Sequence, residues 1–585
     1  MQTGAAMKKN NWWRGAVIYQ IYPRSFLDTN GDGVGDLPGI VEKLDYIAGL
    51  GVDAIWISPF FKSPMADFGY DIADYRDVDP MFGTLADFDA LLVKAHALGI
   101  KVMIDQVLSH CSVEHAWFKE SRESRDNPKA DWYVWADPKE DGTPPNNWMS
   151  LFGGVAWRWE PRREQYYLHN FLASQPDLNF HNPAVRAAVL SDIRFWLDRG
   201  IDGFRIDVSD ALIKDTAWED TPDGNPLIPK DDASGVHEIY RAFRAVMDSY
   251  DGDRMAVIET GAPDDVVALF LRPDEMHLAF NFRFVKAGWD AAAIRAAVDD
   301  SLAAYGAVGA PTTWVTDNHD TTRSVTRYGA DVRLEGEYVP GSTAELPLDD
   351  AALARGTRRA RAMAVLLLGL PGAAYVYAGQ ELGLPEVVDL PAEVLQDPIV
   401  ARSGGTSRGR DGCRVPLPWT AADEPALADF SRPAPADDGT GENHVPLCAA
   451  GQFGTGASFG FSPAVRADGV TPAADPHLPQ PLWFKDYAVD VEQADPDSMY
   501  TLYHAALAIR QESLTATRDT TAEQVDMGAD VVAYRRAAVE GRTFTSVTNF
   551  GTAPVSLPEG SVVLTSGPLT PDGQLPTDTS AWVIK

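Results

Sequence analysis

The stretch Gly203-Phe204-Arg205-Ile206-Asp207-Val208 has the composition of a buried strand, because apolar residues surround one arginine and one aspartate. A helical pattern over residues 183–199, ended by Gly200, precedes it. Arg205 and Asp207 are two residues apart, so they share one face of the strand. Burying such a pair is costly unless geometry and hydrogen bonds compensate. Two interpretations follow: a catalytic carboxylate kept ionised by an arginine, or a structural ion pair at a strand end.

Segments with strand character alternate with helical segments on both sides of this stretch. The eight predicted strands are residues 16–22, 52–58, 101–110, 203–208, 255–259, 277–282, 313–320 and 373–378. Such alternation is typical of a parallel sheet covered by helices. Polar residues gather where these strands end, as in a (β/α)₈ barrel with a site at one face. The sequence therefore predicts an α/β fold built on a (β/α)₈ TIM barrel.

Two further units are expected beside the barrel. Residues 111–177 interrupt the alternation, are rich in Trp, Pro, Asn and Asp, and are too long for an ordinary loop. They are interpreted as a subdomain inserted after the third barrel strand. Residues 514–585 alternate polar and apolar side chains between Gly and Pro, which predicts a C-terminal antiparallel β-sandwich domain. The barrel itself is assigned to residues 1–110 and 178–513.

The bulk composition narrows the class of partner. The chain has 585 residues, 45% of them hydrophobic, and a formal net charge of −34. This length exceeds one compact core, and the charge argues against nucleic acid and anionic membranes as partners. No apolar run reaches about 18 residues, no apolar secretory segment follows Lys8 and Lys9, and there are only three cysteines. We expect a cytoplasmic monomer or homodimer acting on a small molecule.

A glycine-rich acidic loop follows the first predicted strand. Its oxygen-bearing side chains stand at positions 1, 3, 5 and 9, and a backbone carbonyl is available at position 7: Asp28, Asn30, Asp32, Asp36 and Val34. This spacing suits a hard cation, Ca²⁺ or Mg²⁺. Gly39 occupies position 12, where an EF-hand has Glu, and no Gly-Lys-Ser/Thr follows as in a phosphate loop. The alternative is a solvated acidic turn.

Five chemically active side chains end up at predicted strand ends: Asp207, Glu259, Asp320, His110 and His319. A single Asp there is often a cap, and a single buried His is often a satisfied core residue. Five at one barrel face instead suit glycoside hydrolysis with retention, which needs two carboxyl groups about 5–5.5 Å apart. The acid must have a raised pKa while the nucleophile stays ionised, and Arg205 beside Asp207 serves the second requirement.

The order of motifs resembles the α-amylase superfamily, glycoside hydrolase family 13, and within it the α-glucosidase and oligo-1,6-glucosidase group. The resemblance covers nearly the whole chain. It is carried by Asp105-Gln-Val-Leu-Ser-His110, Gly203-Phe-Arg-Ile-Asp-Val208, the strand ending at Glu259, Asn318-His-Asp320, Gln175-Pro-Asp-Leu-Asn179 and Arg410-Asp-Gly-Cys-Arg414-Val-Pro-Leu-Pro-Trp419.

The resemblance implies a role for each matching residue. Asp207 would be the nucleophile, Glu259 the general acid and base, and Asp320 the stabiliser of the transition state. The residues implied to bind the non-reducing glucose are Arg205, His110 and His319 around the ring, Asp67 and Arg414 at its far hydroxyls, Tyr70 stacked on it, and Phe152 and Phe171 as walls. The metal bound by the acidic loop would be structural.

The resemblance leaves function open between related activities. The first is an exo-acting α-glucosidase, favoured over an endo-amylase because Asp67 and Arg414 would close the end of the cleft. The second is a transglucosylase or sucrose-active isomerase on the same scaffold. The third, a non-catalytic relative, would lack the catalytic carboxylates and carry a membrane span. Val208 resembles enzymes that accept α-1,6 bonds, whereas Thr or Ala there resembles α-1,4-specific ones.

Overall fold

The structure is a computed structural model that describes residues 11–226, 228–331, 349–422, 426–427, 454–455, 459–514 and 521–585. The segment with Lys8 and Lys9, on which the expected absence of a secretory leader depends, lies outside these residues. Within the described ranges, no helix is both long and apolar enough to cross a membrane.

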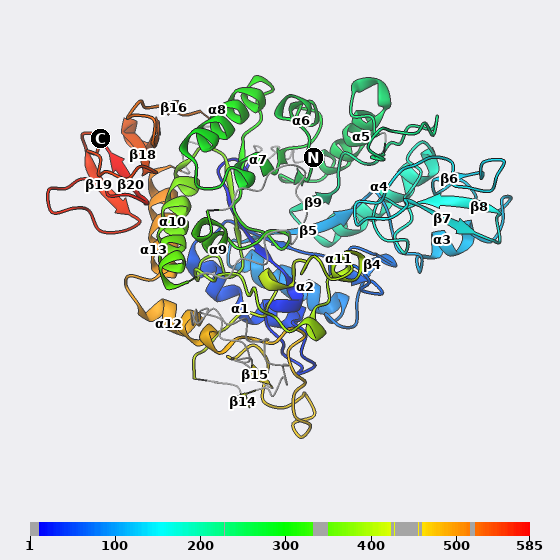
Figure 1. Ribbon diagram of the computed structural model, residues 1–585, viewed down its shortest axis with the longest axis horizontal. Helices are drawn as coiled ribbons and strands as arrows, with labels where there is room; N and C mark the ends of the chain where they lie inside the picture. The colour runs from blue at the N-terminus through cyan, green and yellow to red at the C-terminus, as the bar shows by residue number, and fades with distance from the viewer. Residues whose placement is uncertain are drawn as a thin grey trace, which may run out of the picture.

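Eight parallel strands form a nearly closed barrel, as predicted (Figure 1). Along the sheet the order is β11-β10-β9-β5-β2-β1-β13-β12. Every predicted strand range contains one of these strands, whose bounds are β1 Val17–Ile21, β2 Ala54–Ile57, β5 Lys101–Val107, β9 Gly203–Asp207, β10 Met255–Ile258, β11 Leu278–Ala279, β12 Thr313–Trp314 and β13 Ala373–Tyr377. The barrel strands are almost wholly buried, which explains their near-continuous apolar sequences.

Helices lie around the barrel and between its strands. They are α1 Leu37–Leu50, α2 Leu85–Ala97, α4 Pro183–Arg199, α5 Val236–Asp248, α6 Asp264–Phe270, α7 Phe282–Lys286, α8 Ala291–Ala307, α9 Ser324–Gly329, α10 Asp350–Gly369, α11 Pro398–Arg402, α12 Val489–Ala494 and α13 Met499–Ser513. Helix α4 sets up the catalytic strand: Asn182 caps its N-terminus, and Gly200 ends it with φ 106°, the left-handed conformation that favours glycine. The predicted stop at Gly200 is thus confirmed.

The inserted segment forms a small unit beside the barrel. It contains α3 Ala116–Ser121 and a three-stranded antiparallel sheet in the order β6 Trp135–Ala136, β8 Gln165–Leu168, β7 Trp157–Glu160. The antiparallel bridge between His110 and Asp177 joins its two ends at the barrel. A short hairpin, β3 Phe61–Lys62 with β4 Asp74–Val78, follows β2. Figure 1 places the inserted sheet on the side of the barrel opposite the C-terminal strands.

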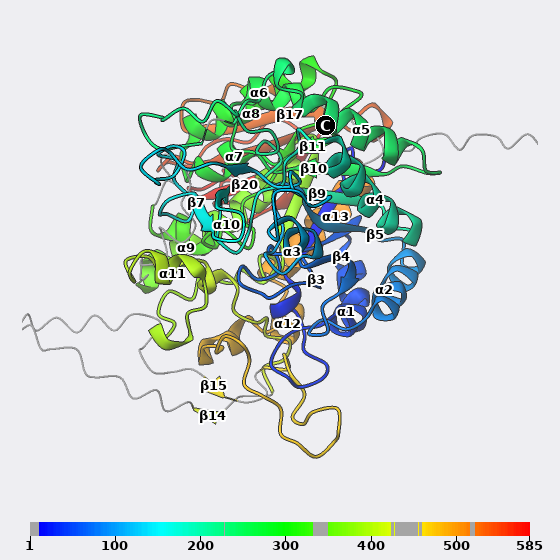
Figure 2. The ribbon, with the colours of Figure 1, turned by 90° about the vertical axis from the view of Figure 1, so that its right-hand side faces the viewer.

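The C-terminal unit is the predicted antiparallel β domain. Its described residues form one five-stranded antiparallel sheet in the order β16 Glu523–Gln524, β17 Val531–Ala537, β18 Thr543–Asn549, β20 Thr579–Ile584, β19 Ser561–Thr565. Helix α10 packs on this sheet (Figures 1 and 2). The indole of Trp582 donates to the carbonyl of Val365 on that helix at 2.9 Å. Loop residues such as Val555 and Leu569 pack on Val531 and Val547 of the sheet. Helix α10 and the loops therefore cover this sheet.

Candidate active site

The register of the barrel strands brings the predicted catalytic side chains together. Asp105 on β5 lies opposite Arg205 on β9, and Val107 opposite Asp207. Glu259 directly follows β10, whose Ile258 pairs with Ile206. Because parallel strands end at the same edge, these carboxyl groups meet at one mouth of the barrel. The register thus brings Asp105, Asp207 and Glu259 to one end of the barrel.

Arg205 is the centre of the site. Its guanidinium donates to Asp105 at 2.8 Å and Asp207 at 2.7 Å through Nη1, and to Glu259 at 2.6 Å through Nη2. The side chain is only 2% exposed and lies 5.3 Å from the centre of the Trp56 ring. One buried cation therefore faces three carboxyl groups, so it organises the site and leaves excess negative charge in it.

Replacing Arg205 with Met should destabilise the fold by about 3–5 kcal/mol, since three buried acids lose their cation. The loss of folding stability should be larger at higher pH. Burial raises the pKa of Asp105 to about 6 even against the opposing effect of Arg205. Without the arginine, this pKa would rise further, so the acids can take up protons at pH 5.5 but must bear charge at pH 8.

Thermal unfolding of Arg205→Met at pH 5.5 and pH 8 measures this difference. Arg199→Met is the matched control, because Arg199 pairs with the half-exposed Asp89 at 3.1 Å and should cost about 0–1 kcal/mol at either pH. An Arg205→Met melting temperature equal to that of the native protein at pH 8 would contradict the assignment.

One guanidinium binds both Asp207 and Glu259. Arg205 donates to Asp207 at 2.7 Å through Nη1 and to Glu259 at 2.6 Å through Nη2. Burial raises the pKa of Asp207 most strongly, Arg205 opposes this rise, and the neighbouring carboxyl groups of Glu259 and Asp105 raise the pKa further. Arg205 therefore favours the ionised form of Asp207, as the sequence predicted, but burial and the neighbouring carboxyl groups outweigh its effect. The glycosidic oxygen of a substrate must lie between Asp207 and Glu259.

Asp320 is kept negative by two arginines. Its Oδ1 accepts hydrogen bonds from Arg410 and Arg414, each at 2.8 Å. Burial alone would raise the pKa of Asp320, but His319 and these arginines outweigh it and hold the pKa well below its usual range. Burial also lowers the pKa of His319 to about 3, so this histidine is neutral near pH 7. The attraction on Asp320 therefore comes mainly from the arginines.

His319 is fixed in one orientation between two tyrosines. Its ring stacks on Tyr70 at 5.5 Å and on Tyr22 at 5.8 Å between ring centres. The amide nitrogen of Gln20 lies 2.7 Å from Nδ1, so Nδ1 accepts and Nε2 carries the proton. Nε2 then lies 3.1 Å from Asp320. The ring of Tyr70, predicted to stack on the sugar, stacks on His319, and the guanidinium of Arg205 lies 5.6 Å from its centre.

Asp67 lies at the far end of the site and contacts two side chains. Arg410 Nη2 lies 3.4 Å from Asp67, and Gln175 donates to Asp67 at 3.0 Å and lies 3.2 Å from His110 Nε2. Arg414, of the same motif as Arg410, donates to Asp320 and to the carbonyl of His319. The binding of far sugar hydroxyls by Asp67 and Arg414 stays a prediction, and Arg410 is a further arginine at this end that the sequence analysis did not single out.

The two predicted aromatic walls lie together near this end. Phe152 contacts Phe171 edge to face at 5.6 Å, and Phe171 lies 4.9 Å from the ring of His110. The guanidinium of Arg410 lies 5.7 Å from the ring of Phe152. Burial lowers the pKa of His110 to about 4, so His110 can only act as a neutral hydrogen-bonding group near pH 7. These residues give the pocket a closed, largely uncharged wall.

Sequence reasoning missed several residues that hold the site in place. Gln20 orients His319, Asp105 accepts from Arg205, and Asp397 holds Arg410 Nε at 2.6 Å. Gln175 and Asp105 belong to motifs that the sequence analysis quoted, so their place in those motifs could have marked them as site residues. No motif contained Gln20 or Asp397. Val208 is notable for another reason: its φ is 42°, a conformation rare for a β-branched residue, and such strain concentrates at functional sites.

Two aspartates of the acidic loop already accept hydrogen bonds from nearby backbone N–H groups. Asp28 accepts hydrogen bonds from the backbone N–H groups of Asn30, Gly31 and Gly33, and Asp36 caps α1. Across the described residues, no three His, Cys, Asp or Glu side chains are arranged as a metal site. A cation here would need the Asn30 amide and the Val34 carbonyl as well. The donors are all oxygens, as Ca²⁺ requires, and the metal itself stays a prediction.

A barrel with an acidic pair and a third, ionised carboxylate at its strand ends is suited to cleaving glycosidic bonds, and the fold and site together define a glycoside hydrolase. The family described as the α-amylase catalytic domain matches residues 20–435. The chain belongs to this family, glycoside hydrolase family 13.

Known relatives agree with this assignment. A probable α-glucosidase of Rhizobium meliloti (strain 1021) is 44% identical, with 77% of this chain and 80% of that protein covered. An oligo-1,6-glucosidase of Heyndrickxia coagulans is 40% identical, over 70% of this chain and 76% of that protein. The crystal structure of an α-glucosyl transfer enzyme, XgtA, is 42% identical with a TM-score of 0.79, covering 98% of this chain and 99% of that chain.

Proposed function

We propose that the protein is a retaining, exo-acting α-glucosidase that releases glucose from the non-reducing end of short α-glucosides. The observation that carries the proposal is the Arg205-centred group of carboxyl groups, together with the buried pair of Asp67 and Arg410, which Arg410 connects to Asp320. We infer that this buried pair closes one end of the sugar site, so that the site admits a terminal sugar and excludes an internal one. The named relatives, α-glucosidase and oligo-1,6-glucosidase, support this choice of substrate class.

The geometry assigns a role to each carboxyl group. Asp207 attacks the anomeric carbon while Glu259 gives its proton to the glycosidic oxygen, which breaks that bond and leaves a glucosyl ester on Asp207. Glu259 then takes a proton from water, which attacks the same carbon and frees Asp207. Asp320, kept negative by Arg410 and Arg414, stabilises the positive charge that develops on the sugar ring. Two inversions give net retention.

Proton NMR of the sugar first released from 4-nitrophenyl α-glucoside tests the stereochemistry. α-Glucose should appear before mutarotation produces the β anomer. Initial β-glucose would overturn retention. Cleavage of internal bonds in a longer chain, which gives a mixture of shorter oligosaccharides in place of glucose, would overturn exo action.

Transfer of glucose to a second sugar is the competing fate of the same ester. An acceptor hydroxyl can replace water at Glu259 without any change in the residues involved. We therefore expect new oligosaccharides at high sugar concentration. A dedicated transglucosylase or sucrose isomerase would form mostly transfer products even at low sugar concentration.

Val208 is proposed to favour α-1,6 bonds. The residue follows the nucleophile, is half-buried, and its N–H lies 3.4 Å from Glu259. Val208→Thr is nearly isosteric and keeps the β-branch, so it changes one methyl to a hydroxyl without altering backbone strain. We expect the ratio of kcat/KM for isomaltose to that for maltose to fall by about tenfold. An unchanged ratio, with kcat for 4-nitrophenyl α-glucoside also unchanged, would contradict the proposal.

A structural Ca²⁺ in the loop from Asp28 to Asp36 is proposed on its oxygen-only donors. Burial and the neighbouring Asp28 raise the pKa of Asp32, a sign of crowded negative charge that a cation would relieve. Chelation should lower the melting temperature of the native protein, since a ligand that binds only the folded state stabilises it. Asp32→Ala should start lower and lose this response. If a chelator left the melting temperature of the native protein unchanged, that result would contradict the proposed metal site.

A further inference from the structure

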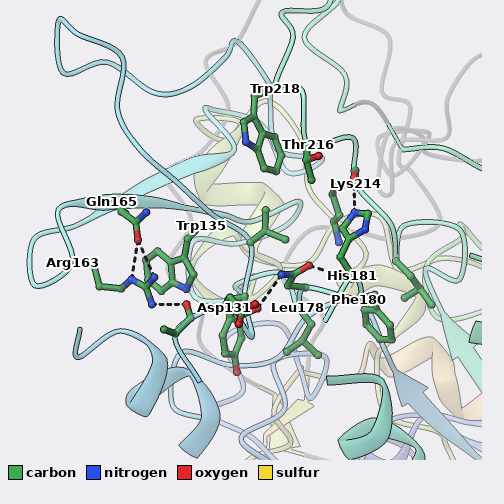
Figure 3. A pocket seen from close by; sticks show the side chains of 15 residues that line it. Asp131, Trp135, Arg163, Gln165, Leu178, Phe180, His181, Lys214, Thr216 and Trp218 are labelled. Carbon is green, nitrogen blue, oxygen red and sulfur yellow. Dashed lines mark hydrogen bonds between the residues drawn. The ribbon is translucent and has the colours of Figure 1, made fainter. Parts of the chain in front are cut away.

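A second cavity lies outside the catalytic group, between the inserted subdomain and the loop that follows β9 (Figure 3). It has a volume of about 260 Å³. The inserted subdomain contributes Asp131, Trp135 and Gln165 to its lining, and the loop contributes Lys214, Thr216 and Trp218. Asp207, Glu259 and Asp320 do not line it. The reaction described above makes no use of this cavity.

The two strong cations of the lining already have partners. Arg163 donates through Nε and Nη2 to Gln165, at 3.1 and 2.9 Å, and through Nη1 to the carbonyls of Ser121 and Ala130. Lys214, 2% exposed, lies 2.6 Å from the fully buried Asp177. Figure 3 shows Arg163 and Gln165 beside Trp135, with Lys214 and His181 across the cavity. Because the donors of Arg163 are already occupied by neutral oxygens and Lys214 is paired with a carboxylate, the cavity favours a neutral ligand over a phosphate or a carboxylate.

Two indoles supply apolar surface within this polar lining. Trp135 has Arg163 over it at 4.1 Å, which fixes its ring. Trp218 is held edge to face by Trp148 and Trp157, at 5.7 and 5.2 Å. The backbone of Trp218 has φ 53°, a conformation that costs free energy in a residue other than glycine. The loop backbone is therefore strained at Trp218, the residue whose indole lines the cavity.

The polar groups at the open side complement those indoles. Asp131, Thr216 and His181 are exposed and line the same cavity, and Asn179 lies beside them. A pyranose ring presents apolar C–H faces and a rim of hydroxyl groups, which matches indole faces bordered by carboxylate, amide and hydroxyl groups. The volume falls below the usual range of about 300–1,000 Å³ for larger ligands, so one sugar ring fits better than an oligosaccharide.

We propose that this cavity is a second, non-catalytic binding site for a single neutral glucosyl unit. The choice of glucose rests on the proposed α-glucosidase function; the preference for a neutral sugar ring rests on the cavity alone. Binding there should be weak, with a Kd of about 1–10 mM, because one ring buries little surface and the site is open on one side.

The test uses the full-length protein with its active site blocked. Reaction with 5-fluoro-α-glucosyl fluoride should attach one sugar to Asp207, which mass spectrometry verifies. Saturation-transfer NMR then follows binding of methyl α-glucoside to the blocked protein. We expect binding to persist in the blocked native protein and to weaken at least about tenfold in Trp218→Ala. Absence of binding to the blocked native protein up to about 100 mM would overturn the proposal.

Two further variants keep this test decisive. Thr216→Arg places bulk at the exposed mouth, so it should abolish binding even if Trp218→Ala folds poorly. Trp159→Ala is the matched control, because Trp159 is a 39% exposed tryptophan of the same subdomain outside the cavity. Hydrolysis of 4-nitrophenyl α-glucoside by the unblocked variants should be unchanged. Loss of binding in Trp159→Ala, or full binding in Thr216→Arg, would contradict the site.

A failure of the proposed function would be visible separately, because mass spectrometry would then show no attached sugar. In that case a crystal soaked in methyl α-glucoside decides the question. Density for a sugar ring between Trp135 and Trp218 supports the second site, and an empty cavity at saturating sugar overturns it.

Discussion

Asp207→Ala should lower kcat for 4-nitrophenyl α-glucoside by at least about 10⁴-fold, because the carboxylate that forms the covalent ester is gone. The variant should fold, since Arg205 keeps Asp105 and Glu259 as partners. Azide is small enough to enter the vacated space and attack from the same side as the lost carboxylate. It should restore part of the activity and yield β-glucosyl azide, identified by NMR.

Asp210→Ala is the control for this experiment. Asp210 lies in the loop three residues after Asp207 and pairs with Lys230 at 2.6 Å. Its removal should change kcat by less than about tenfold. An α-glucosyl azide product from Asp207→Ala, or loss of activity as large in Asp210→Ala, would show that Asp207 is not the nucleophile.

The Glu259→Ala variant should affect substrates differently, according to whether their leaving group needs a proton. Maltose and isomaltose need a proton on the departing oxygen, so their kcat/KM should fall by about 10²–10⁴-fold. Formation of the ester from 4-nitrophenyl α-glucoside needs no such proton, but hydrolysis of the ester lacks its base and should become rate-limiting. Rapid mixing should then show a burst of nitrophenol followed by a slow steady state.

Azide again identifies the missing group, with the opposite stereochemical result. It should attack the ester on Asp207 in Glu259→Ala and give α-glucosyl azide, because the second inversion restores the original configuration. A β-glucosyl azide here, or an equal loss for both classes of substrate, would mean that Glu259 is not the acid and base. Together the two variants assign each carboxyl group through the configuration of a product.

Much of this protein was predictable from residue order. Strand periodicity, helix stops such as Gly200, and polar groups at strand ends each reflect local rules, and together they predicted the barrel and the inserted segment. The C-terminal antiparallel domain was predicted too, but what covers its sheet was not, because β-strand patterns report that one face is buried without reporting what packs on it. Here helix α10, distant in sequence, covers the sheet that contains Trp582.

The sequence by itself determined which reacting groups exist and that they meet at one barrel face, because strand ends in a parallel barrel share an edge. Only the tertiary structure decided which groups pair. Arg410 rather than Arg414 contacts Asp67, Gln20 orients His319, and one guanidinium serves three carboxyl groups. Such choices depend on side-chain directions and on the balance between burial and opposite charge, which residues far apart in the chain set only once they are packed together.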